Sequence, residues 1–227
     1  INRTPPKTQA ALLQGMQEKN ISAGTKHYQL PRPFFVLATQ NPIEQEGTYP
    51  LPEAQLDRFL MKIIVKYPTR DEERQIYKAV TGDDQVEPES TLTGEEVLEL
   101  QHLVRRVPIS DFLVDYTMDL IRATRRDGDD APEFINRWVL WGAGPRGGQS
   151  LILAAKARAA LYGRPEVTVE DLQAVAKAVL RHRIVLSYNA ESEGQSPDTV
   201  IEKLIEETPL QQSAAGKDGQ YERILKS

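Results

Sequence analysis

Three polar side chains stand at positions from which a protein can bind phosphate: Asn41, Arg58 and Arg146. The amide of Asn41 both donates and accepts hydrogen bonds, so it can contact a phosphate oxygen and help to orient a water molecule. Each arginine carries a permanent positive charge, and its fork of N–H donors matches the spacing of phosphate oxygens. Phosphoryl transfer depends on such groups, because it requires positioning and neutralisation of phosphate charge.

Each of these side chains also has an ordinary structural alternative. An asparagine that precedes proline, as Asn41 does, more often satisfies the backbone of a turn. Arg58 is near Asp57 and Glu53, with which it could form a surface ion pair of little energetic value. Arg146 follows a Gly-Pro pair and could simply begin a helix. The residue pattern alone leaves both interpretations of each residue open.

The elements around Asn41 and Arg58 suggest part of a parallel sheet. The apolar run Phe34–Thr39 predicts a strand buried on both faces, with Asn41 just beyond its carboxyl end. Ligands of open α/β sheets bind at this end of the strands. A short helix, Glu53–Phe59, is then expected to carry Arg58, followed by a second strand at Met61–Val65.

A helix and a hairpin are expected before the first of these strands. Thr4 is the predicted N-cap and Pro5 the first residue of a helix that runs to Glu18. Gln9, a polar residue of this helix, is not expected to contribute to a core. The segment Ile21–Leu30 contains β-favouring residues around a glycine and predicts a small hairpin.

From Tyr67 onward the pattern becomes helical, and no strand is predicted. Most of this part is predicted to be helical, with capping boxes, a helix after Ser110 and a helix from Pro145 to Gly163. Residues 127–144 are expected to be irregular. We therefore divide the chain into residues 1–67, an incomplete α/β part, residues 68–188, an all-helical part, and residues 189–227, a polar tail with a short amphipathic piece at Val200–Ile205. The predicted capping boxes pair Thr69 with Glu72, Thr93 with Glu96 and Thr168 with Asp171.

The composition sets limits on the class of protein. With 40% hydrophobic and 27% charged residues, the 227-residue chain is typical of a folded, globular protein, and no apolar run reaches the roughly 18 residues that span a bilayer. The absence of cysteine excludes disulfides and thiolate metal sites and agrees with a cytoplasmic location. A net charge of -5 disfavours general attraction to nucleic acid. The three histidines are too scattered to predict a metal site.

Five segments, in this order, resemble MoxR-type AAA+ ATPases. The first resembles the stretch that follows the Walker B acids, the second the sensor 1 strand end, the third the arginine-finger segment, the fourth sensor 2, and the fifth the end of the helical lid. Together they give a specific resemblance, although any one of them could arise by chance. In the same order, the five segments are Ile1–Leu13, Ala38–Pro42, Gly47–Phe59, Gly144–Arg146 and Val179–Ile184.

The resemblance implies an α/β partial P-loop (AAA+) core followed by an all-α lid subdomain. It also implies that Asn41 senses the γ-phosphate, that Arg58 enters a neighbouring subunit's nucleotide site as an arginine finger, and that Arg146 reaches the phosphates from the lid. The three are then expected to converge on one triphosphate pocket. Gly147 and Gly148 depart from the family pattern, because residues better suited to a helix are expected at these positions. Each glycine costs a helix about 1 kcal/mol relative to alanine.

The same resemblance implies ATP hydrolysis, with ATP and Mg²⁺ as cofactors, coupled to chaperone-like remodelling of protein complexes. The assembly is expected to be a homo-oligomeric ring, a hexamer, with a partner protein that carries a von Willebrand factor A domain. No G-x-x-x-x-G-K-S/T loop and no strand ending in Asp-Glu occurs in the sequence. We therefore expect the chain to be a fragment that alone neither binds ATP tightly nor hydrolyses it.

Two alternatives from other classes remain. One is a nucleic-acid motor, because related AAA+ branches also carry a hairpin before sensor 1. The other is a non-catalytic interaction module that retains the fold without a nucleotide loop. Salt-dependent DNA binding would favour the first, and a degenerate phosphate loop in the parent protein would favour the second.

Overall fold

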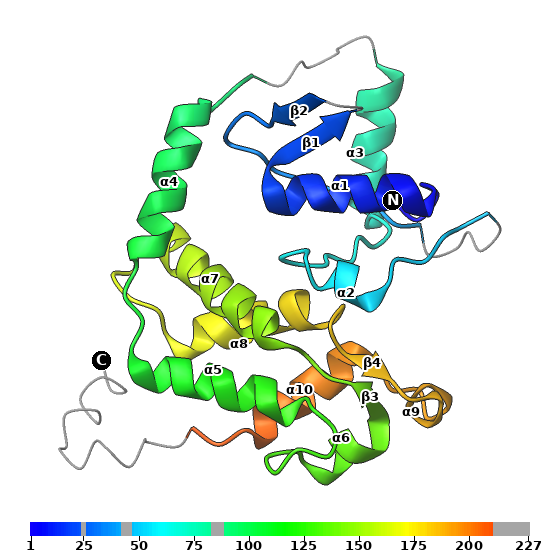
Figure 1. The fold of residues 1–227 in the computed structure, drawn as a ribbon, viewed down its shortest axis with the longest axis vertical. Coiled ribbons are helices and arrows are strands. Elements are labelled where there is room, and N and C mark those ends of the chain that lie inside the picture. Colours follow the sequence, from blue (N-terminus) through cyan, green and yellow to red (C-terminus); the bar gives the residue numbers. More distant parts are fainter. Residues whose placement is uncertain (24–25, 42–46, 83–88, 211–227) are drawn as a thin grey trace.

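The amino-terminal part of the computed structural model consists of two helices and a hairpin. The structure describes residues 1–23, 26–41, 47–82 and 89–210. Helix α1 spans Pro6–Glu18, strands β1 (Asn20–Ala23) and β2 (Lys26–Gln29) pair antiparallel as predicted, and α2 spans Glu53–Leu56. Figure 1 shows the hairpin beside α1, with α2 between them and the helical part of the chain.

Helices dominate the rest of the chain, and two short strands join them. Four of these helices, α5, α7, α8 and α10, pack together away from the hairpin (Figure 1). The elements are α3 (Arg70–Thr81), α4 (Gly94–Arg106), α5 (Asp111–Ala123), α6 (Glu133–Trp138), β3 (Val139–Trp141), α7 (Pro145–Leu161), α8 (Val169–Leu180), β4 (Val185–Leu186), α9 (Tyr188–Ser192) and α10 (Pro197–Glu207).

Local capping explains where most helices begin. The three predicted capping boxes are formed at α3, α4 and α8, and Ser110 caps α5 as expected. The predicted N-cap Thr4 is wrong, because Pro5 occupies that position of α1 without a side-chain cap. Pro5 precedes Pro6, and a residue before proline avoids the helical region, so the helix begins one residue later.

The two predicted strands do not form. Residues 34–39 and 61–65 belong to no helix or strand, and Leu37 and Val65 are 85% and 91% exposed. A strand buried in a parallel sheet requires neighbours that bond its N–H and C=O groups. In the described ranges no segment pairs with either of them. The strand predictions are therefore wrong for this structure, and several of the apolar side chains in these segments, including Leu37 and Val65, are exposed.

The carboxyl-terminal region also differs from its prediction. The residues predicted to be irregular form α6 and β3, and β3 pairs antiparallel with β4 through Val139 and Leu186. The predicted amphipathic piece Val200–Ile205 lies within α10, but the tail around it is not only polar, because it also contains α9 and the rest of α10. Val200, Ile201 and Leu204 of α10 are fully buried, because they complete the apolar core of the helical part. Residues 211–227 lie outside the described residues.

A tight crossing of two backbones holds the segment that leads into α7. A Cβ atom at Gly142 would lie 2.2 Å from the carbonyl oxygen of Thr124, so only glycine fits there. The buried hydroxyl of Thr124 accepts a hydrogen bond from the backbone N–H of Ala143 (2.9 Å) and donates one to the carbonyl of Ile121 (2.6 Å). The start of α7, which carries Arg146, is therefore attached to the end of α5.

Candidate functional site

Arg58 lies in the turn that follows α2, which is shorter than the predicted helix. Its backbone N–H bonds to the carbonyl of Gln55 at 3.2 Å, and its buried Nε has no hydrogen-bond partner among the described residues. The carboxylate of Asp57 instead contacts Arg183, with 2.8 Å between Oδ1 and Nε. Within the described part of the chain, neither Asp57 nor Glu53 forms an ion pair with Arg58, so the ordinary structural alternative is not realised.

Arg58 and Arg146 line the same surface hollow, which has a volume of about 260 Å³. Three elements form its walls: the end of α1, the turn after α2, and the first turns of α7. Half of the Arg146 side chain is exposed, and its Nη1 lies 4.0 Å from Oδ2 of Asp57. Two guanidinium groups beside a helix N-terminus make this hollow suitable for an anion. The other lining residues are Met16, Gln17, Asp57, Gln149 and Ser150.

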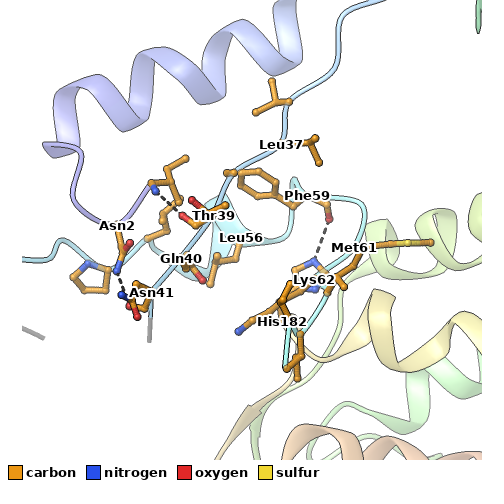
Figure 2. Close-up of a pocket in the computed structure, with 18 of the residues that line it drawn as sticks. Asn2, Leu37, Thr39, Gln40, Asn41, Leu56, Phe59, Met61, Lys62 and His182 are labelled. Carbon is orange, nitrogen blue, oxygen red and sulfur yellow. Dashed lines mark hydrogen bonds between the residues drawn. The ribbon is translucent and has the colours of Figure 1, made fainter. Parts of the chain in front are cut away.

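Asn41 lies on a different and larger cavity of about 760 Å³. Figure 2 shows Thr39, Gln40 and Asn41 along one extended segment, with Lys62 and His182 on the opposite side. The Nδ2 of Asn2 donates to the backbone carbonyl of Asn41 at 3.4 Å. The structure thus brings Arg58 and Arg146 together and places Asn41 in a different cavity. Because Arg58 is expected to act on a neighbouring subunit's nucleotide, only Asn41 and Arg146 are expected to converge within one chain, and in this structure they line different cavities.

Gln9 has a structural role that the sequence interpretation missed. It is only 2% exposed, and its Nε2 donates to the carbonyls of Ile1 and Tyr49, each at 3.1 Å. These bonds connect α1 with the segments on either side of the cavity that contains Asn41. The one available signal was spacing, because Gln9 lies one helical turn before the buried Leu13 on the same face.

Two further residues, His182 and Arg183, connect the helical part to the turn that carries Arg58. The Nε2 of His182 lies 3.1 Å from the carbonyl of Phe59, whereas its buried Nδ1 has no partner in the described residues. A carbonyl accepts only, so the neutral ring carries its proton on Nε2. From the sequence, these residues were recognised only as part of the segment that resembles the end of the helical lid. A stronger signal was available, because an arginine and a histidine next to buried apolar residues require partners.

Burial lowers the pKa of His182 to about 4, and the positive charge of Arg183 acts in the same direction. Between pH 6.5 and pH 4 the unfolded chain therefore gains a proton at this residue that the folded chain does not. Stability should fall by about 3 kcal/mol as the pH decreases through this window, and it should be fully restored above pH 6.5. Urea unfolding of the wild type and of His182→Gln at several pH values measures the effect.

The variant His182→Gln should lose this part of the pH dependence, because glutamine keeps an N–H donor without titrating. His102, in the exposed part of α4, offers a matched control, and His102→Gln should leave the pH dependence of the wild type intact. An unchanged pH dependence in His182→Gln would show that this histidine is not responsible.

No metal site is evident in the part of the chain that the structure describes, where no three acidic or histidine side chains gather. No helix among the described ranges is both long and apolar enough to cross a membrane. The hollow lined by Arg58 and Arg146 supports anion binding, because both guanidinium groups are positively charged.

Two protein families match separate parts of the chain. Residues 1–61 match the family described as "ATPase family associated with various cellular activities (AAA)". Residues 136–204 match the family described as "AAA lid domain". The first match covers the turn with Arg58, and the second covers Arg146 and the end of α8.

Relatives extend the similarity over most of the chain. It is 42% identical over 212 residues to "Chaperone MoxR1" of Mycobacterium tuberculosis, which covers 93% of this chain and 56% of that protein. It is 38% identical over 217 residues to "Uncharacterized protein YeaC" of Bacillus subtilis, covering 94% of this chain and 65% of that protein. The chain therefore spans between about half and two thirds of the length of these relatives.

A solved structure has the same arrangement of elements. It is that of a putative ATPase from Cytophaga hutchinsonii, which is 40% identical, with a TM-score of 0.88. The alignment covers 93% of this chain and 64% of the solved chain.

Proposed function

Since the chain belongs to the AAA+ ATPases, in the branch of MoxR-type proteins, we propose that it supplies phosphate-binding arginines to a ring that hydrolyses ATP. The fold class expected from the sequence, a partial α/β core followed by a helical lid, is that of these relatives. In the proposed function, hydrolysis drives chaperone-like remodelling of protein complexes. The name of the M. tuberculosis relative, a chaperone, supports this part of the proposal.

The observation that carries the proposal is the shared hollow of Arg58 and Arg146. Arg58 lines this hollow and forms no ion pair with the acidic residues that the structure describes, so its positive charge is left for a ligand. We assign it to the phosphates of a neighbouring subunit's ATP. Because Arg146 lies beside Arg58 and apart from Asn41, we assign Arg146 to the same phosphates. Asn41 is proposed to contact the γ-phosphate of its own subunit's nucleotide.

The proposed cofactors are ATP and Mg²⁺. Bound Mg²⁺ would neutralise phosphate charge during hydrolysis. The two arginines fit the phosphate groups, because both are permanently charged and one of them lies in the first turn of α7. The described residues provide no acidic cluster for the metal, so we assign no magnesium ligand to them.

A site shared between subunits requires a closed assembly. We propose a homo-oligomeric ring of six subunits, since an arginine that acts on a neighbour needs a neighbour at every position. A partner with a von Willebrand factor A domain is proposed from the family resemblance alone.

The experiment measures ATP turnover by the intact protein as a function of its concentration, with sedimentation in parallel. Turnover per subunit should rise as rings form, because each site is complete only when a neighbour is present. Constant turnover per subunit in samples that sediment as monomers would contradict the shared site. Salt-dependent DNA binding near physiological ionic strength would instead support the nucleic-acid motor.

A further inference from the structure

A single buried arginine of the lid contacts the core turn that carries Arg58. Arg183 follows α8 and is only 5% exposed. Its Nε donates to Oδ1 of Asp57 at 2.8 Å, its Nη2 donates to Oγ of Ser150 at 3.2 Å, and its Nη1 donates to the carbonyl of Val179. The guanidinium therefore joins α7, the end of α8 and the turn after α2.

The Arg183 side chain forms hydrogen bonds with the backbone carbonyls of the residues on both sides of Arg58. Its Nη2 donates to the carbonyl of Asp57 at 3.0 Å and to that of Phe59 at 2.7 Å, and its Nη1 donates to the carbonyl of Leu60 at 3.3 Å. Asp57 and Phe59 are the residues immediately before and after Arg58. Fixing both neighbours leaves the Arg58 backbone little freedom, since the two carbonyls are held by the same planar group.

Arg58 does not take part in the ion pairs of Asp57. Asp57 is paired with Arg183 at 2.8 Å and is also near Arg146 at 4.0 Å. Its carboxylate is thus occupied by these two cations, and Arg58 stays available for an external anion.

The departure from the family pattern at Gly147 also has an explanation here. A Cβ atom at Gly147 would lie 3.3 Å from Cδ of Arg183 and 3.4 Å from Cδ1 of Ile121. Such contacts are tight, so a larger residue would have to displace the arginine or the helix. The glycine allows the first turn of α7 to approach Arg183 closely.

We propose that Arg183 and Asp57 form a clamp that positions Arg58 and couples its position to that of the lid. The proposal rests on the proposed function, in which Arg58 contacts a neighbour's phosphates. Arg183 acts through Arg58 and is a positioning residue. When the lid shifts, Arg183 moves with it, and its bonds to the turn around Arg58 move that turn as well.

The test is a double-mutant cycle in the intact protein with Arg183→Lys and Arg58→Ala. Lysine keeps the charge of Arg183 but cannot hold several carbonyls with one planar group. Arg183→Lys should lower kcat by about 10²-fold, because small misplacements of a catalytic group have effects of this size. The KM for ATP should stay within about twofold, as expected when only transition-state stabilisation is lost. In the Arg58→Ala background, Arg183→Lys should cause no further loss.

The outcomes separate the two proposals. If Arg58→Ala alone leaves turnover unchanged, the proposed role of Arg58 is wrong. If Arg183→Lys lowers kcat by the same factor with and without Arg58, the clamp is wrong, because its effect does not pass through Arg58. Should Arg183→Lys fail to fold, Asp57→Asn keeps the side-chain shape, removes the charge and enters the same cycle with the same expected results.

Arg181 is the matched control. It lies two residues before Arg183 and pairs with Asp198 through bonds of 2.9 and 3.0 Å, but it contacts none of residues 57–60. Arg181→Lys should leave kcat within about twofold of the wild type, since lysine keeps the charge that pairs with Asp198, and the other bond of Arg181, to the carbonyl of Lys62, lies outside the turn that carries Arg58. An equal loss of kcat in this variant would point to a general effect of the lid end and would overturn the clamp.

Discussion

In the proposed ring, replacing Arg58 with alanine is expected to lower the kcat of ATP hydrolysis by about 10³-fold, the typical contribution of an arginine finger. The affinity for ATP should change little, because a finger acts on charge that develops in the transition state. The fold should be preserved, since the Nε of Arg58 bonds to none of the described residues. Steady-state hydrolysis and fluorescent-nucleotide binding measure the two effects separately.

A matched arginine on the lid surface controls for general loss of charge. Arg122 of α5 forms an exposed ion pair with Asp130 at 2.7 Å, far from the hollow in sequence, and Arg122→Ala should leave kcat near the wild-type value. Mixing Arg58→Ala subunits into wild-type rings should lower turnover in proportion to the number of sites that lose their neighbour's arginine. Full turnover in rings built only from Arg58→Ala subunits would refute the assignment.

Replacing Asp171 with alanine should have the largest effect on stability, a loss of about 4 kcal/mol in the free energy of unfolding. The carboxylate is fully buried between α7 and α8. It accepts hydrogen bonds from Nη1 of Arg158 at 2.6 Å, from Arg164, and from the backbone N–H of Thr168 at 3.0 Å. Its removal leaves two half-buried guanidinium groups without this buried anion and removes the Asp171 half of the capping box at the start of α8. Urea unfolding followed by circular dichroism provides the measurement.

The pKa of Asp171 predicts how this contribution depends on pH. Burial raises this pKa, but the hydrogen bonds from Thr168, Arg158 and Arg164 together outweigh it, so the pKa lies below its usual value. The unfolded chain therefore binds this proton more readily than the folded chain does. The stabilisation is complete above the ordinary aspartate value of about 3.9 and is lost as the pH falls through the lowered pKa.

Glu170 is the neighbouring control for Asp171. Its side chain is 80% exposed and lies 3.7 Å from the same Arg158. Glu170→Ala should change the free energy of unfolding by no more than about 0.5 kcal/mol, as surface substitutions usually do. Comparable losses in the two variants would mean that burial of Asp171 is not the source of its effect.

The features that were predicted correctly depend on neighbouring residues alone. Thr69, Thr93 and Thr168 each bond to a residue three positions along the chain, so the local sequence is sufficient to place those helix starts. The strands at 34–39 and 61–65 require partners elsewhere, and an apolar run does not show whether such partners are present. The same limit explains why the burial of α10 was not predicted, because its buried face depends on contacts with α5 and α8.

The candidate site shows the same division. The types of Arg58 and Arg146 indicated phosphate binding, and their resemblance to known motifs selected them among many arginines. Their common hollow depends on how α1, α2 and α7 pack, which no local pattern contains. The partners of Arg183 in the turn after α2 lie more than a hundred residues away in the sequence, so its role could not be read from the residues around it.

The backbone crossing of Gly142 with Thr124 determines which parts of the lid can move independently. Because no side chain fits between these backbones and Ala143 is bonded to Thr124, a hinge at this junction would have to break a buried hydrogen bond. Helices α5 and α7 are therefore expected to move as one rigid body, and any displacement of Arg146 in the hollow would be transmitted directly to α5.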